Sequence, residues 1–326
     1  MKHAVTLAFA CSLLTLSGQA NAQDYTFEKG RGIVLKLDDD IIGRVVDLAL
    51  DADGRFILAD DRQHTIWVVE SSGVVSHRIG REGAGPGELN RPLGVALSDE
   101  KLAVLDSGNN RVTIFSKDGT HLSDFRIENL LPPSGILAGN EGKIAVTSIW
   151  DEPNITVYET NGTLGYEIGK IVLGGKPIMP MRTNFHHVSQ TPEGRILYSP
   201  VKRYEIYQLD WDGTILHTYI AEPDGYFPFP DAPPSRPGPM NVTPLFRPLK
   251  VSGHVVVQRA GKTADGESGV FGDLFTDDGA IVQTGIELPM VFFNSDGEEC
   301  YGIDTAPVDE GEDNPHIVVY RLVGGE

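Results

Sequence analysis

Cysteine is nearly absent from this chain. Only Cys11 and Cys300 occur among 326 residues. Cys11 falls in an N-terminal segment that we expect to be removed, which leaves Cys300 without a partner for an intrachain disulfide. Cys300 lies in a short apolar stretch and is predicted to be a small buried side chain. The fold must therefore be stabilised by packing and hydrogen bonds rather than by covalent cross-links.

Basic residues are scarce relative to acids. The chain has 27 Lys and Arg against 46 Asp and Glu, which gives a formal net charge of −19 at pH 7. A surface of this charge repels phosphate backbones and anionic lipid headgroups. We therefore expect neither nucleic acid nor a membrane surface to be a partner. We also predict a monomer.

Long apolar runs are missing as well. The apolar stretch Ala4–Leu16 is too short for a membrane-spanning helix. It follows Lys2 and precedes Ala20–Ala22, an A-x-A cleavage site. We therefore expect residues 1–22 to be a cleaved signal peptide. Residues 23–326 are then predicted to form one exported domain, periplasmic or secreted.

What the chain does contain is a repeat of strands and turns, with a period of about 45 to 50 residues. The clearest copy is Leu93–Ile127, in which four runs of β-branched and apolar residues alternate with turns rich in Gly and Asp. Such a unit is typical of a four-stranded antiparallel meander. Repetition at this period predicts a β-propeller, an architecture that hosts binding proteins and several unrelated enzymes.

Tight turns that need a positive φ give the number of units. They recur at Ser72-Gly73, Asp118-Gly119, Asn161-Gly162, Asp212-Gly213 and Asp278-Gly279. The five units begin near Arg44, Arg91, Ser134, Phe185 and Pro248. The C-terminus adds three more strands, and Tyr25–Leu37 has no unit of its own. We predict an all-β, six-bladed β-propeller closed by this N-terminal strand, which would remove an exposed sheet edge.

Two motifs resemble a known group of proteins. Asp106–Val112, which reads DSGNNRV, and the preceding Gly80–Leu89 resemble the NHL repeat and its inter-blade linker. The combination is similar to that of secreted bacterial six-bladed β-propeller proteins. In the first unit, Asp60–His64 keeps the leading Asp but lacks the Asn and Arg of the motif. The resemblance implies the fold more strongly than any activity.

Candidate ligand-binding residues lie where the chain enters the inner strands. Arg44, Arg91 and Arg247, with His186 and His187, would converge on one mouth of the central channel. Such a cationic spot would favour a ligand that carries a carboxylate or a phosphate. Because the two histidines are adjacent, only one of them can face the channel.

An alternative assigns these arginines a structural role. They would pair with acids of neighbouring loops, such as Asp60 and Asp106, and lock the blades together. Both interpretations stay open at this stage.

A proline-rich loop, Glu222–Arg247, interrupts the regular period. Proline restricts its conformations, while Tyr226, Phe227 and Phe229 offer flat apolar contact area. The loop could cover the channel or dock a partner, or its aromatic side chains could pack onto the fourth and fifth blades. The sequence does not decide between these alternatives.

The predicted function is the binding of a protein, a peptide or a small anionic ligand through the loop-rich face and the channel mouth. The alternative is a metal-dependent lyase or hydrolase centred on the channel. This alternative follows from the resemblance, because peptide α-amidating lyases use zinc bound by channel histidines and lactonase-type propellers use calcium. We predict no cofactor, with zinc or calcium belonging to the enzymatic alternative, and assign no catalytic or metal-binding residue.

Overall fold

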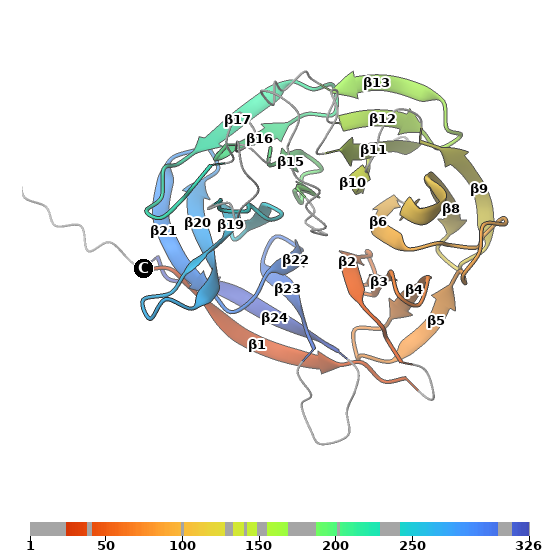
Figure 1. The fold of residues 1–326 in the computed structure, drawn as a ribbon, viewed down its shortest axis with the longest axis horizontal. Coiled ribbons are helices and arrows are strands. Elements are labelled where there is room, and N and C mark those ends of the chain that lie inside the picture. Colours follow the sequence, from red (N-terminus) through yellow and green to blue (C-terminus); the bar gives the residue numbers. More distant parts are fainter. Residues whose placement is uncertain are drawn as a thin grey trace, which may run out of the picture.

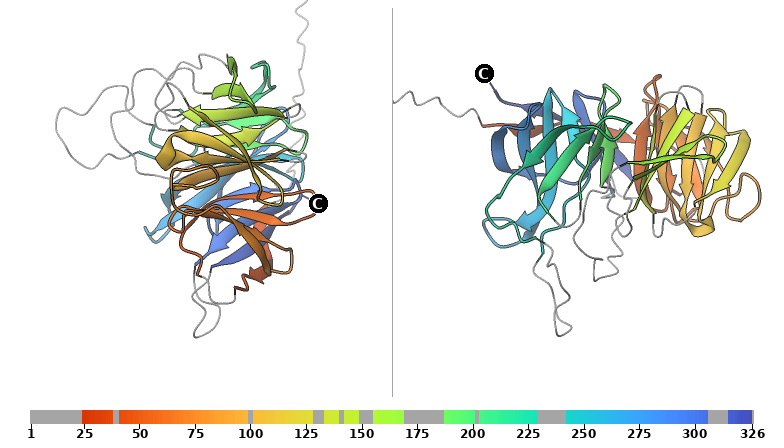
Figure 2. Two further views of the ribbon diagram at one scale, coloured as in Figure 1. Left: turned by 90° about the vertical axis from the view of Figure 1, so that its right-hand side faces the viewer. Right: turned by 90° about the horizontal axis from the view of Figure 1, so that it is seen from above.

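Six antiparallel sheets of four strands each surround a central axis in the described residues (Figure 1). The computed structural model describes residues 24–37, 41–98, 101–127, 133–139, 142–148, 155–168, 187–200, 203–228, 242–305 and 315–325. Seen from the side, the sheets form a short, broad body (Figure 2). The predicted six-bladed β-propeller is therefore confirmed. The expected signal peptide, residues 1–22, lies outside the described residues.

Each blade runs from an inner strand at the channel to an outer strand at the rim. Blade 1 consists of β2 (Val45–Leu50), β3 (Phe56–Asp60), β4 (Thr65–Val69) and β5 (Val75–Ile79). Blade 2 consists of β6 (Pro92–Ser98), β7 (Lys101–Asp106), β8 (Arg111–Ser116) and β9 (His121–Arg126). A 3₁₀ turn, η1 (Ser107–Asn109), joins β7 to β8. Blade 3 consists of β10 (Pro133–Ala138), β11 (Lys143–Ser148), β12 (Ile155–Glu159) and β13 (Leu164–Ile168).

The remaining blades follow the same order. Blade 4 consists of β14 (Val188–Gln190), β15 (Ile196–Tyr198), β16 (Glu205–Leu209) and β17 (Ile215–Ile220). Blade 5 consists of β18 (Leu249–Val251), β19 (His254–Lys262), β20 (Ser268–Thr276) and β21 (Ile281–Leu288). Blade 6 consists of β22 (Phe292–Ser295), β23 (Glu299–Asp304), β24 (His316–Val323) and β1 (Thr26–Val34).

The first and last described strands close the ring. β1 pairs antiparallel with β24, with Thr26 opposite Val323 and Val34 opposite His316. β1 is thus the outermost strand of blade 6, as the sequence predicts. The edge of β24 that would otherwise be unpaired is covered by this pairing.

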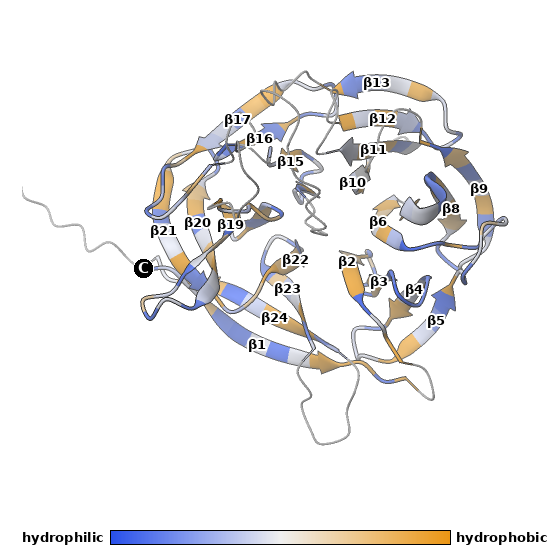
Figure 3. Ribbon diagram, in the orientation of Figure 1, coloured by the Kyte–Doolittle hydropathy of each residue, from blue (hydrophilic) through white to orange (hydrophobic). Residues whose placement is uncertain are grey.

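The core consists of six apolar clusters, each between two neighbouring blades. One cluster joins Ile57 of blade 1 to Val104 of blade 2, and another joins Tyr301 of blade 6 to Leu48 of blade 1. Burial of apolar surface between the sheets stabilises the ring, since each blade has a neighbour on both sides. Figure 3 shows the apolar character of the inner strand β2 beside the more polar rim strands β1 and β5.

The outer strands share one irregularity near their starts. In blades 1 to 5 the register with the preceding strand shifts by a β-bulge. Each bulge follows one of the predicted tight turns, whose glycines have φ between 83° and 97°. Bulges twist an edge strand and hinder edge-to-edge pairing. The repeat seen in the sequence is therefore a repeat of backbone conformation.

Candidate functional site

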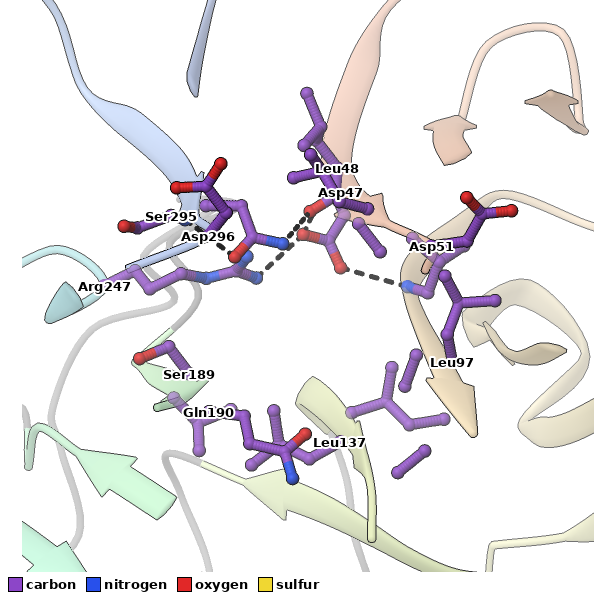
Figure 4. A pocket seen from close by; sticks show the side chains of 18 of the residues that line it. Asp47, Leu48, Asp51, Leu97, Leu137, Ser189, Gln190, Arg247, Ser295 and Asp296 are labelled. Carbon is purple, nitrogen blue, oxygen red and sulfur yellow. Dashed lines mark hydrogen bonds and ion pairs between the residues drawn. The ribbon is translucent and has the colours of Figure 1, made fainter. Parts of the chain in front are cut away.

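The inner strands surround a central cavity of about 500 Å³ (Figure 4). We call the side on which the chain enters the inner strands the linker face. The opposite side carries the turns between the first and second strands of each blade, and we call it the hairpin face. Toward the hairpin face, a second cavity of about 520 Å³ shares Asp51, Leu97 and Gln190 with the first. The two cavities together form the channel.

A buried ion pair crosses one side of the channel. Arg247, two residues before β18, places Nη2 2.8 Å from Oδ1 of Asp47 in β2. Its Nη1 donates to the carbonyl of Phe293 in β22, and Oδ2 of Asp47 accepts the amide of Val95 in β6 at 3.0 Å. The two side chains are only 10% and 2% exposed. One arginine and one aspartate therefore connect four consecutive blades, 5, 6, 1 and 2.

Two amide side chains continue this connection. Asn294 donates from Nδ2 to the carbonyl of Leu48 at 3.0 Å, which joins blade 6 to blade 1. Gln258 donates to the carbonyls of Arg247 and Phe292 and accepts the amide of Phe292. Because these buried groups are hydrogen-bonded, this part of the channel wall has a defined geometry.

Carboxylates lie near the hairpin face. Burial raises the pKa of Asp51, but hydrogen bonds from the amide and guanidinium of Arg55 outweigh this effect and keep the pKa below its usual value. Asp296 shows the same balance, since hydrogen bonds from the Glu299 amide and the Tyr301 hydroxyl oppose the effect of burial on its pKa. Both acids are therefore ionised at neutral pH and already bound to protein donors.

Two of the three predicted arginines are neutralised by nearby acids. Arg44 pairs with Asp61, and the hydrogen bond that its guanidinium donates to this carboxylate raises the pKa of Arg44. Arg247 pairs with Asp47 as described above. These contacts agree with the structural alternative, although the acids differ from those the sequence suggests. Asp60 instead accepts the amide of Arg44 at 2.9 Å.

The third predicted arginine, Arg91, is exposed. It has a positive φ of 53°, and its amide donates to Nδ1 of His64 at 3.0 Å. Neither Arg44 nor Arg91 lines the channel cavity, whereas Arg247 does. The arginines therefore lie on the linker side of their blades without meeting at one point.

The predicted histidine pair is described only in part. His187 is 4% exposed, and its carbonyl accepts the amide of Ser199 at 2.8 Å. It is followed by Val188, which lines the channel. His186 lies outside the described residues.

Two aromatic side chains at the start of the proline-rich loop have different surroundings. Tyr226 packs edge-on against Tyr204, with ring centroids 5.3 Å apart, and burial raises its pKa to about 12. Phe227 is 46% exposed, while its backbone is held by two hydrogen bonds to Thr243. Tyr226 therefore belongs to the packing of blade 4, and Phe227 faces solvent. Phe229 lies outside the described residues.

The acidic side chains, histidines and cysteine bear on the predicted metal-dependent alternative. Across the described ranges, no group of three or more His, Cys, Asp or Glu side chains could hold a metal ion. Residues 306–314 of the acidic loop lie outside these ranges. Cys300 is fully buried, and burial raises its pKa, so the thiol stays protonated.

Asp47, Asn294 and Gln258 were not among the candidate site residues predicted from the sequence. A usable signal existed for two of them. Asp47 and Asn294 are polar residues inside otherwise apolar inner strands. A polar residue at such a position needs a buried partner, which indicates a contact between blades.

The chain also matches known proteins. The family described as "6-bladed beta-propeller" matches residues 21–226. Protein brain tumor of Drosophila melanogaster is 26% identical over 149 residues, which are 44% of this chain and 14% of that protein. Protein lin-41 of Caenorhabditis elegans is 48% identical over 46 residues, 14% of this chain and 4% of that protein. This chain thus spans a small part of the length of these relatives.

Solved structures share the fold. A candidate exported protein of Bacteroides fragilis has a TM-score of 0.64 at 13% identity, covering 93% of this chain and 96% of that one. Streptogramin B lyase has a TM-score of 0.51 at 14% identity, covering 92% and 98%. Identities this low show the fold alone.

Three observations indicate the same family. They are the match over residues 21–226, the six four-stranded sheets and the NHL-like linker motif. No helix in the described part of the chain is long and apolar enough to cross a membrane. The chain belongs to the 6-bladed beta-propeller family and is related to the NHL-repeat proteins.

Proposed function

We propose that this chain is an exported binding protein that holds a small ligand, or the end of a peptide, in its central channel. The A-x-A site after an apolar N-terminal stretch supports export. The B. fragilis protein that shares this fold is described as exported, which agrees with the proposal.

The observation that carries the proposal is the rigid polar band made by Asp47, Arg247 and Asn294. A cavity of about 500 Å³ falls in the size range of small-molecule sites. Hydrogen bonds to four blades fix the band before any ligand arrives, so binding would order few side chains.

The lining suggests the ligand's chemistry. Leu48, Leu97 and Leu137 contribute apolar surface, and Gln190 and Ser295 contribute hydrogen-bonding groups (Figure 4). The ion pair with Asp47 neutralises Arg247, the cation among the described residues that line the first cavity, while Lys101 and Lys117 line the second cavity. A neutral ligand with both apolar and hydrogen-bonding parts therefore fits the first cavity better than an anion. No specific observation on the described residues favours the enzymatic alternative.

Filling the channel tests the proposal. Leu97 lines both cavities, so Leu97→Trp would occupy part of the channel. Leu122→Trp is the matched control, because Leu122 lies on the outer strand of the same blade and is 48% exposed.

Ligand-observed NMR with monosaccharides, N-acetyl amino-acid amides and dipeptides would identify binders of the unmodified protein. We expect Leu97→Trp to abolish their binding and Leu122→Trp to preserve it. Binders that tolerate Leu97→Trp would show that the channel is not the site.

A further inference from the structure

At the linker face, the first two strands of blades 1 and 2 pair in the same register. Val45 pairs with Asp60 where β2 begins, and Pro92 pairs with Asp106 where β6 begins. The residues before these strands, Arg44 and Arg91, therefore occupy equivalent positions. By the same register, Asp61 of blade 1 corresponds to Ser107 of blade 2, and His64 corresponds to Asn110.

The two equivalent arginines differ in their counter-charge. Arg44 pairs with Asp61 through two nitrogens. In blade 2 the corresponding Ser107 is uncharged and donates its hydroxyl to the carbonyl of Arg91 at 2.6 Å. Within the described ranges, no carboxylate forms an ion pair with Arg91. The charge of Arg44 is thus neutralised by a described acid, and the charge of Arg91 is not.

Acids close to Arg91 are already engaged. Asp106 is fully buried and binds Arg111 and the side chain of Asn109. Glu82, which is 77% exposed, lies 3.9 Å from Nε2 of His64. Both acids therefore lie close to a described partner other than Arg91.

The backbone at Arg91 is strained. Its φ of 53° lies in the left-handed region, as does the φ of 55° at His64. A glycine would adopt this conformation without steric cost, whereas an arginine does not. The bond from the Arg91 amide to Nδ1 of His64 and the bond from Ser107 hold the conformation in place. Strain of this kind is characteristic of residues whose side chain has a role.

We propose that Arg91 is an anion-binding residue of the linker face and that its ligand is a carboxylate of a peptide or small molecule. A guanidinium without a counter-charge presents a planar fork that matches a carboxylate. Arg62, exposed and two residues before His64, adds a second positive charge to this turn. The net charge of −19 opposes a doubly charged phosphate more than a singly charged carboxylate. This subsite lies outside the channel and does not rest on the channel function.

Blade 1 supplies the design of the test. Ser107→Asp places the blade-1 acid beside Arg91 and should neutralise it. Ser252→Asp is the matched control, since it adds the same charge at an exposed position on the hairpin face. Binding would be measured by NMR titration at low ionic strength with the blocked peptide acetyl-Gly-Gly-Glu-Gly-Gly-amide.

We expect the glutamate peptide to bind with millimolar affinity, and the Kd to rise about fivefold or more in Ser107→Asp, in line with the loss of one charge-assisted contact. Ser252→Asp should change the Kd by less than about twofold. Equal weakening by both variants would reduce the effect to net charge and overturn the proposal.

Probe chemistry separates the sources of the negative charge. A C-terminal acid, acetyl-pentaglycine, tests the terminal carboxylate against the side-chain carboxylate, and binding of either supports the proposal. Equal binding of the glutamine analogue, or tighter binding of inorganic phosphate, contradicts the carboxylate assignment.

Arg91→Gly separates binding from structure. It relieves the backbone strain, so the midpoint of thermal unfolding should stay the same or rise while peptide binding is lost. A fall in the midpoint with binding retained would show that Arg91 is structural.

Discussion

Blades 2 and 5 each bury an aspartate against an arginine, but they assemble the pair differently. In blade 2, Arg111 Nε donates to Asp106 at 2.9 Å across one loop. In blade 5, Arg259 Nε donates to Asp273 at 2.7 Å between the adjacent strands β19 and β20. Both aspartates are fully buried. Both pairs join an aspartate to an arginine, but the two partners are 5 residues apart in blade 2 and 14 residues apart in blade 5.

The partners of each pair extend the difference. Arg111 also donates to the carbonyls of Gly85 and Glu88 and so holds the linker between blades 1 and 2. Asp273 accepts the hydroxyl of Tyr204 at 2.6 Å, and so holds blade 4 to blade 5. The Asp106–Arg111 pair thus holds an inter-blade linker in place, whereas the Arg259–Asp273 pair connects the sheets of blades 4 and 5 directly.

The largest effect is expected at the blade-5 pair. Asp273→Ala leaves the guanidinium of Arg259 buried without a counter-charge, and it should lower the free energy of unfolding by about 3–5 kcal/mol. Chemical denaturation measures this loss. Asp265→Ala, in the exposed turn of the same hairpin, is the control and should have little effect. A small loss of unfolding free energy in Asp273→Ala would mean that water solvates the guanidinium of Arg259 in place of the carboxylate.

A smaller effect is expected in blade 2. Arg111→Ala should cost about 2–3 kcal/mol, because Asp106 keeps its bonds to Asn109 and to the amide of Asn90. Amide hydrogen exchange in the linker should also increase. The exposed Arg126, changed to Ala, serves as the control. If Arg111→Ala proved costlier than Asp273→Ala, the linker would matter more than the sheet contact.

Asp51 and Arg55 form a third, less buried pair, with 23% of the Arg55 side chain exposed. Because the pKa of Asp51 is lowered by folding, its contribution is complete above the usual value of 3.8 and is lost as the pH falls through the folded-state value. Asp51→Asn should cost about 1–2 kcal/mol at pH 7. Thermal unfolding should show the difference from the unmodified protein shrinking below about pH 4. A difference independent of pH would contradict this.

The smallest effect is expected for the exposed pair between Arg81 and Glu88. The Arg81 side chain is 81% exposed, so solvent screens the interaction. The midpoint of thermal unfolding of Arg81→Gln should match that of the unmodified protein. A measurable fall in this midpoint would show that the degree of burial does not predict how much each of the four pairs contributes to stability.

Much of the fold could be predicted from the sequence because its signals are local. A tight turn needs a glycine at one position, so Gly73, Gly119 and Gly213 reveal three blades directly. The Asp106–Arg111 loop is equally visible, since six consecutive residues contain the whole motif. Closure by β1 could be inferred because Tyr25–Leu37 had no other partner.

The site was less predictable because side-chain contacts depend on distances across the fold. Arg44 and Arg247 were placed on the correct loops, yet each binds an acid that its position in the sequence does not reveal. The hydrogen bond from Tyr204 to Asp273 could not be predicted for the same reason, because the two residues are 69 positions apart in the sequence. Arg91 was a candidate from the sequence as well, but the difference between its surroundings and those of Arg44 is visible only when the two blades are compared residue by residue.

Pairing of β1 with β24 has a consequence for how the chain folds. Thr26 meets Val323, so this sheet is complete only when segments from opposite ends of the described residues have come together. Contacts between such distant segments form slowly, because the intervening chain must first be ordered. Until the final strand arrives, Phe27 and Ile33 lack the neighbours that bury them. A partly folded chain in which β1 and β24 have not yet paired therefore exposes apolar side chains of β1.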